Sequence, residues 1–193
     1  MMKKLLLLLF LIPLISCTEG WTGEKENIYL QDRNGIKYEV NSEVGFTGKG
    51  VRWYENGQKK DEVNFKNGMK NGLHTMWFEN AKKRYETNYK NGKKEGLYTR
   101  WHENGQKESE VNNKNGKWDG LYTRWHENAK KRYEINYKNG KIDGLYTRWH
   151  ENGQKEYETN YKDGGHDGLV TEWDKEGNVT KTETNSKDGE LVK

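Results

Sequence analysis

Polar and apolar side chains alternate along most of the chain, and the alternating pattern returns every 24 residues. Tryptophan marks the period at Trp53, Trp77, Trp101, Trp125, Trp149 and Trp173. Glycine keeps the same spacing at Gly48, Gly72, Gly96, Gly120, Gly144 and Gly168. A fixed period of this length is typical of repeat proteins, in which each unit packs on its neighbours. We therefore expect five full units over residues 48–167, a divergent C-terminal repeat or cap over 168–193, and a degenerate N-terminal repeat or cap over 28–47.

One unit, GLYTRWHENGQKEYETNYKDGGHD at residues 144–167, shows the arrangement. After its first glycine, Leu-Thr-Trp alternates with Tyr-Arg-His, and a second alternating run follows an Asn-Gly turn. Such alternation predicts two β-strands for each unit. The sequence thus predicts an all-β fold, an elongated single-layer antiparallel sheet of stacked β-hairpins. Twelve strands at about 4.8 Å would form a ribbon roughly 55–60 Å long.

The register of the hairpins decides which side chains share a face. A two-residue first turn would set each Trp opposite Lys or Arg, whereas a turn of odd length would set it opposite Tyr. Ala81 and Ala129 replace a glycine of this turn in two units, and alanine resists the positive φ of a type I′ turn. We therefore expect the odd turn, and left-handed residues only at the second turn, at Gly68, Gly92, Gly116, Gly140 and Gly164. The expected result is a structural aromatic ladder of Trp53, Trp77, Tyr85, Trp101, Trp125, Tyr133, Trp149, Tyr157 and Trp173.

The opposite face is expected to be polar, with Arg100 opposite Glu110 and equivalent pairs in the next two units. Its exposed residues form a candidate contact surface of Tyr98, Tyr122, Tyr146, Arg100, Arg124 and Arg148. The aromatic ladder would be too large an apolar area to leave in water. Curling of the sheet, a second copy, a partner or a ligand could each cover it.

The first residues, MMKKLLLLLFLIPLISC, have the basic start and short apolar run of a secretory signal. The run is shorter than the roughly 20 residues of a spanning helix. Leu14 to Cys17 resembles the bacterial lipobox, which implies a signal peptide over residues 1–16 and a lipidated Cys17 followed by a tether to residue 27. An ordinary secretory signal and an uncleaved anchor remain alternatives. Lipidation would place the protein in the cell envelope, at the outer membrane in a bacterium that has one.

The amino-acid composition excludes several classes of protein. Beyond residue 16, only 22 of 177 residues are Leu, Ile, Val or Phe, too few for a large aliphatic core. The same part holds all 8 Trp and 12 Tyr, which disordered chains lack. Its 32 basic residues nearly balance its 30 acidic ones, so we expect no nucleic-acid partner.

The run YKNGKIDGLYTRWHENGQK, residues 137–155, resembles the bacterial variant of the MORN repeat. The resemblance covers roughly residues 48–192 and implies stacked β-hairpins with a binding or scaffolding role and no shared activity. Some bacterial members are labelled antitoxins, whereas the secretory signal argues against a cytoplasmic antitoxin. The chain also departs from the variant by having Trp where many members have Tyr.

No catalytic, cofactor or metal site is expected. His102, His126 and His150 recur every 24 residues, about 9.6 Å apart on the sheet, too far to share a zinc ion that binds each ligand at about 2 Å. We expect these histidines in an exposed slot that holds Tyr54 and Phe78 in other units, and we expect His74 and His166 at the surface. Catalytic groups need one special environment, which near-identical units do not provide.

These observations favour a non-catalytic envelope lipoprotein that acts as a repeat scaffold for binding a protein. One alternative is a module that binds cell-wall glycans through exposed aromatic rings. Another is an immunity or antitoxin-like protein that neutralises one partner.

Overall fold

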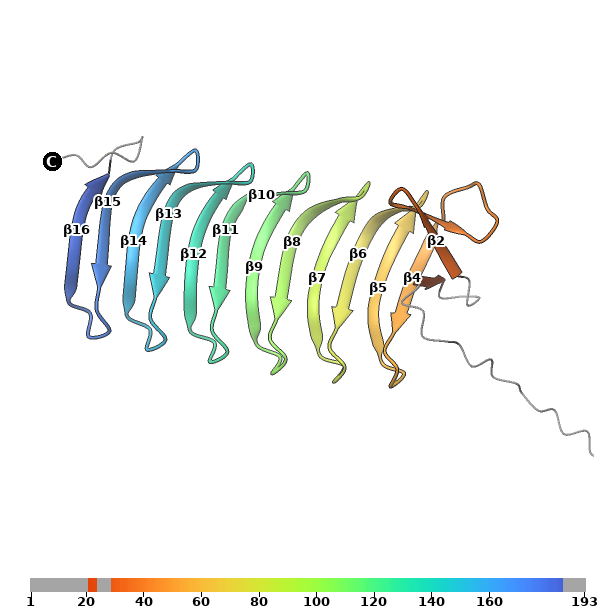
Figure 1. The fold of residues 1–193 in the computed structure, drawn as a ribbon, viewed down its shortest axis with the longest axis horizontal. Helices are drawn as coiled ribbons and strands as arrows, with labels where there is room; N and C mark the ends of the chain where they lie inside the picture. Colours follow the sequence, from red (N-terminus) through yellow and green to blue (C-terminus); the bar gives the residue numbers. More distant parts are fainter. Residues whose placement is uncertain (1–20, 24–28, 186–193) are drawn as a thin grey trace, which may run out of the picture.

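A computed structural model describes residues 21–23 and 29–185, and every regular element in them is a β-strand (Figure 1). The predicted signal peptide and Cys17 lie outside these residues. The strands form one antiparallel sheet in the order β16-β15-β14-β13-β12-β11-β9-β8-β7-β6-β5-β4-β1-β2-β3, in which chain neighbours pair except that β4 pairs with β1 and β11 with β9. This open sheet of consecutive hairpins confirms the predicted fold class. None of the described residues belongs to a helix that could cross a bilayer.

Six hairpins make up the ribbon, and their strands lie side by side along its length (Figure 1). The bounds are β4 Gly48–Trp53 with β5 Lys59–Lys66, β6 Met69–Trp77 with β7 Lys83–Lys90, β8 Lys93–Trp101 with β9 Lys107–Lys114, β11 Gly120–Trp125 with β12 Lys131–Lys138, β13 Lys141–Trp149 with β14 Lys155–Lys162, and β15 Gly165–Trp173 with β16 Val179–Asn185. The short β10, Lys117–Trp118, pairs with β9 just before β11.

The N-terminal strands cap the ribbon. β1 (Trp21–Gly23) pairs with β4 and with β2 (Tyr29–Arg33), and β2 pairs with β3 (Ile36–Glu39). In Figure 1, β2 crosses in front of the first strands of the ribbon. Leu30 and Phe46 are buried against Val63 and Phe65 of β5. The prediction of a tether over residues 17–27 is therefore wrong at residues 21–23, which are part of the sheet.

The predicted register is wrong by one residue. Trp101 pairs with Lys107 across a five-residue loop, but the next pair is Arg100 with Ser109, because a β-bulge adds one residue to β9. Equivalent shifts follow the Trp of each hairpin. Each Trp thus faces Lys, the arrangement that we had rejected. A slip of one residue moves every side chain of a strand to the other face.

The first turn has the expected odd length but not the expected conformation. Ala81 and Ala129 adopt φ of 63° and 62°, so alanine does occupy the left-handed position that we had argued against. The second turns are as predicted: Lys90 pairs with Lys93 across Asn91 and Gly92, whose φ values are 49° and 77°. Two consecutive positive φ values are typical of a type I′ turn.

Candidate binding surface

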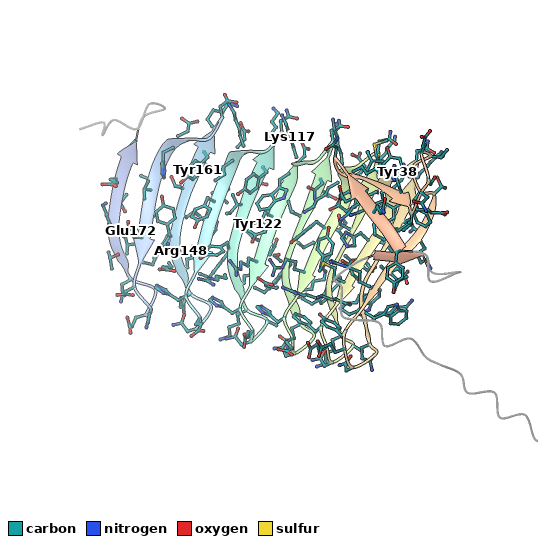
Figure 2. All side chains as sticks on the ribbon, turned by 45° about the vertical axis from the view of Figure 1, so that its right-hand side comes forward. Tyr38, Lys117, Tyr122, Arg148, Tyr161 and Glu172 are labelled. Carbon is teal, nitrogen blue, oxygen red and sulfur yellow. The ribbon has the colours of Figure 1, made fainter. Side chains whose placement is uncertain are left out.

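The corrected register gathers the tyrosines on one side of the sheet. Paired residues share a face, and Tyr85 pairs with Arg100, Thr87 with Tyr98, and Tyr98 with Val111. We call this side the tyrosine face; its rings are Tyr85, Tyr89, Tyr98, Trp118, Tyr122, Tyr133, Tyr137, Tyr146, Tyr157 and Tyr161. Figure 2 shows Tyr122, Arg148 and Tyr161 on the same side of the ribbon. The predicted ladder of alternating Trp and Tyr is therefore wrong, because the repeat tryptophans lie on the other face.

The tyrosine rings pack against one another along the ribbon. Ring centroids lie 5.2 Å apart for Tyr85 and Tyr98, and 5.5 Å apart for Tyr146 and Tyr157. Trp118 stacks on Tyr122 at 5.1 Å with an interplanar angle of 11°. Such aromatic pairs stabilise the sheet beyond the area they bury. The rings nevertheless remain half-exposed, except for the buried Tyr85.

Beneath the rings runs a core that is one side chain thick. It consists of the buried residues Val63, Thr87, Val111, Ile135 and Thr159, one from each full unit. Val111 is 1% exposed although no second layer covers it, whereas Val63, 0% exposed, also packs with Leu30 and Phe46 of the N-terminal cap. The tyrosines therefore serve as the cover of this core and as the molecular surface at once.

The six residues of the predicted contact surface share the tyrosine face. The structure thus keeps Tyr98, Tyr122, Tyr146, Arg100, Arg124 and Arg148 together, but adds Tyr85, Tyr133 and Tyr157 to the same side. The predicted partners of the arginines are wrong. Instead of Glu110, Glu108 binds both Arg100 (3.3 Å) and Arg124 (3.2 Å). Arg148 binds Glu156 at 2.9 Å.

The hydroxyls of Tyr98, Tyr122, Tyr146 and Tyr157 stay neutral. Burial raises the pKa values of Tyr98, Tyr122 and Tyr146, and it raises the pKa of Tyr157 to about 12. Loss of water around a phenol disfavours the charged phenolate. The face therefore presents hydroxyl donors beside guanidinium groups at any physiological pH.

The other side, which we call the tryptophan face, carries ordered lysine–glutamate pairs together with a row of exposed leucines, Leu73, Leu97, Leu121, Leu145 and Leu169. Lys83 Nζ lies 5.7 Å from the Trp101 ring centroid and 2.6 Å from Glu86, and the same motif recurs in later units at Lys107, Lys131 and Lys155. Thr147 donates to Glu158. The tryptophans are thus in an ordered array, but their neighbours are lysines rather than the predicted tyrosines.

The loop histidines bridge neighbouring units, which the sequence did not reveal. Nε2 of His102 lies 3.2 Å from the carbonyl oxygen of Trp125, and Nε2 of His150 lies 3.0 Å from that of Trp173. Tyr54 donates to Trp77 in the same way. The slot predicted as exposed is therefore half-buried, and it is hydrogen-bonded to the next unit at Tyr54, His102 and His150. Among the described residues no three His, Cys, Asp or Glu side chains gather as metal ligands would.

Asparagines add a second bridge between the same loops. Asn104 accepts a hydrogen bond from the Gln106 amide within its own loop and donates to the carbonyl of Glu127 in the next loop, at 2.9 and 3.0 Å. The bond to the next loop recurs at Asn56, Asn80 and Asn152. These bonds fix the loops to one another along one long edge of the ribbon.

One buried polar cluster interrupts the repeat near the cap. His74 Nε2 lies 2.6 Å from Asp61 Oδ1, Arg52 binds the other carboxylate oxygen, and Lys70 Nζ lies 3.5 Å from His74 Nδ1. Burial lowers the pKa of His74 although Asp61 opposes the shift. Burial opposes ionisation of Asp61, but hydrogen bonds from His74 and Arg52 outweigh it and lower the pKa of Asp61.

The surface positions predicted for two histidines are therefore wrong. His74 is 5% exposed and packs against Tyr85, with ring centroids 5.0 Å apart. His166 is half-buried, with Nε2 3.0 Å from the Tyr161 hydroxyl. The missed signal was a paired departure from the repeat: Asp61 and His74 both occupy positions that hold Tyr in most later units.

Fold and surface together define an open β-hairpin repeat with two chemically distinct faces. Four segments of the chain match the MORN repeat variant, at residues 46–67, 94–115, 118–139 and 142–163. Each match covers one hairpin, and the hairpin β6–β7 between the first two matches has the same register shift. No curated protein matches the sequence.

Proposed function

We propose that the chain is a non-catalytic binding scaffold of the bacterial cell envelope, anchored through lipid on Cys17, that holds a partner protein on its tyrosine face. MORN repeats are generally protein-binding or membrane-binding motifs. The observation that carries the proposal is the continuous row of half-exposed tyrosines with adjacent arginines. Aromatic and arginine side chains are the types enriched where proteins bind one another.

The two faces differ in how far their groups are already occupied. On the tryptophan face, each of the recurring lysines pairs with one glutamate at 2.5–2.7 Å over a ring, and leucines such as Leu97 are exposed on the same face. On the tyrosine face, Glu108 serves two arginines at distances of 3.2 Å or more. Two guanidinium groups that share one carboxylate leave positive charge for an external acidic group, whereas Arg148 is paired one-to-one with Glu156.

The test is crosslinking in intact cells followed by identification of what co-purifies with the tagged chain. We expect a protein whose recovery is lost in Tyr122→Ala and Arg124→Ala but kept in Leu121→Ala, which alters the neighbouring side chain on the opposite face. A Cys17→Ala form reports whether capture needs the anchor. Equal recovery with all surface variants would refute the assignment of the tyrosine face, and recovery of murein alone would favour the glycan alternative.

A further inference from the structure

The tyrosine face repeats at a spacing that restricts its ligand. Tyr98, Tyr122 and Tyr146 lie on strands β8, β11 and β13, each two strands from the next. Strands are about 4.7–4.9 Å apart, so these rings recur about every 9.4–9.8 Å along the ribbon. Arg100, Arg124 and Arg148 follow two residues later and form a parallel row about 6.6–6.8 Å away.

A peptide that runs along these rows must present a side chain at the same interval. A β-strand presents one on the same side every 6.6–6.8 Å or so, which does not match. An α-helix repeats after seven residues, about 10.5 Å, and drifts by almost 2 Å over two units. A polyproline II helix has three residues per turn and rises about 9.3 Å per turn, so it drifts by only about 0.6 Å.

The chemistry of the face agrees with this geometry. Polyproline II chains have no internal hydrogen bonds, so their carbonyl groups need donors such as the neutral tyrosine hydroxyls. Grooves lined by aromatic rings are the usual sites for proline-rich segments. The surroundings of the arginine row also carry an excess of positive charge. Glu108 and Glu156 are present only in alternate units, and Arg84 and Arg132 occupy the equivalent positions in the others.

We propose, as a refinement that rests on the proposed function, that the tyrosine face between β7 and β14 binds an acidic, proline-rich segment of the partner in the polyproline II conformation. The segment runs along the ribbon with one turn for each 24-residue unit. Proline rings at every third position lie between the tyrosines. Acidic side chains at an intervening position meet Arg100, Arg124 and Arg148.

The test uses the full chain and a synthetic peptide of four Pro-Ala-Glu triplets. Trp118, stacked on Tyr122, supplies an intrinsic fluorescence readout, which Trp118→Phe should remove while calorimetry still detects binding. We expect Tyr122→Ala to weaken binding at least tenfold and Leu121→Ala to change it less than twofold. Higher salt should weaken binding, because the arginines are partly exposed.

Two matched peptides test the spacing and the charge. A peptide of identical composition with prolines at every second and fourth position should bind at least tenfold more weakly, and so should Pro-Ala-Lys triplets. Equal affinity for the respaced peptide, or no binding of the triplet peptide, would overturn the inference. Tyr122→Phe, which keeps the ring, guards against a folding defect: circular dichroism should be unchanged and binding should fall a few-fold through loss of one hydroxyl.

The outcomes separate this inference from the function it rests on. If the triplet peptide does not bind but Tyr122→Ala still abolishes capture of the cellular partner, the face binds a protein of another conformation and only the refinement fails. If Tyr122→Ala changes neither, both proposals fail. A dimer in sedimentation velocity that Tyr122→Ala dissociates, with no peptide binding, would assign the face to a second copy and overturn the inference.

Discussion

Truncating one core residue tests whether the tyrosine face is the side that stabilises the sheet. Val111 is 1% exposed, so Val111→Ala removes two buried methyl groups at about 0.8 kcal/mol each. Incomplete relaxation around the small cavity adds to this, giving an expected loss of about 2 kcal/mol. Leu97→Ala is the matched control from the same hairpin: Leu97 is 48% exposed on the tryptophan face, and its truncation should cost less than about 1 kcal/mol.

Equilibrium urea unfolding, followed by circular dichroism and by tryptophan fluorescence, measures both variants. The midpoint should fall clearly for Val111→Ala and little for Leu97→Ala, with unchanged dependence on urea. In the register expected from the sequence, Val111 and Leu97 lie on one face, and the two truncations would lower the free energy of unfolding by similar amounts. Equal losses, or a larger loss for Leu97→Ala, would therefore refute the bulged register and the thin core derived from it.

Three further predictions concern turns, titration and the loop edge. Ala81→Gly should stabilise the chain by up to about 1 kcal/mol, because relief of a left-handed alanine exceeds the added freedom of glycine, and Gly105→Ala should destabilise it by a similar amount in thermal unfolding. Acidification should destabilise the fold in two steps. Below the usual His pKa of 6.5, His74 takes up a proton more readily in the unfolded chain than in the folded one, and near and below pH 3.8 the same holds for Asp61. Urea unfolding at several pH values measures this loss of stability. His74→Gln should make the free energy of unfolding depend less on pH below pH 6.5, and an unchanged dependence would contradict the assignment. Asn104→Ala removes two hydrogen bonds and should cost about 1–2 kcal/mol, with faster amide hydrogen exchange confined to the adjoining loops.

The sequence was sufficient for the features that depend on local chemistry. The 24-residue period, the two strands of each unit and the left-handed residues of the second turns follow from alternation and from the turn glycines, which act within a few residues. The fold class could therefore be predicted from the pattern alone. The six residues of the contact surface were also placed on one face correctly, because Tyr98 and Arg100 are two residues apart on one strand.

The register was beyond that reasoning for a physical reason. The bulge after Lys107 adds one residue, Glu108, to the strand, and nothing in the alternation marks it, because Lys107 and Glu108 are both charged. Parity counted across an unseen bulge reverses every assignment beyond it. The cluster of Asp61 and His74 was missed as a consequence. The expected register puts the two side chains on opposite faces of the sheet, whereas the observed register puts them on the same face.

Removing one complete unit tests how far the repeats act independently. Deletion of residues 120–143 joins Asp119 to Gly144 and preserves the phase of the 24-residue repeat. Because each unit contacts only its neighbours, the shortened chain should keep the far-ultraviolet circular dichroism of a β-sheet and cooperative unfolding, at a somewhat lower midpoint. Its tyrosine face would lose Tyr122 and Arg124, so triplet peptides should bind more weakly. A peptide with one Pro-Ala-Glu triplet fewer should then bind the shortened chain as tightly as the longer peptide does.

Deletion of residues 120–142, one residue shorter, is the control. It puts the following strands out of phase by one residue, which directs their tyrosines to the opposite face and their leucines towards the core. We expect this variant to lose cooperative unfolding or to aggregate. If both deletions behave alike, the units do not stack through a fixed register, and the thin core inferred from Val111 and its equivalents cannot be what holds the ribbon together.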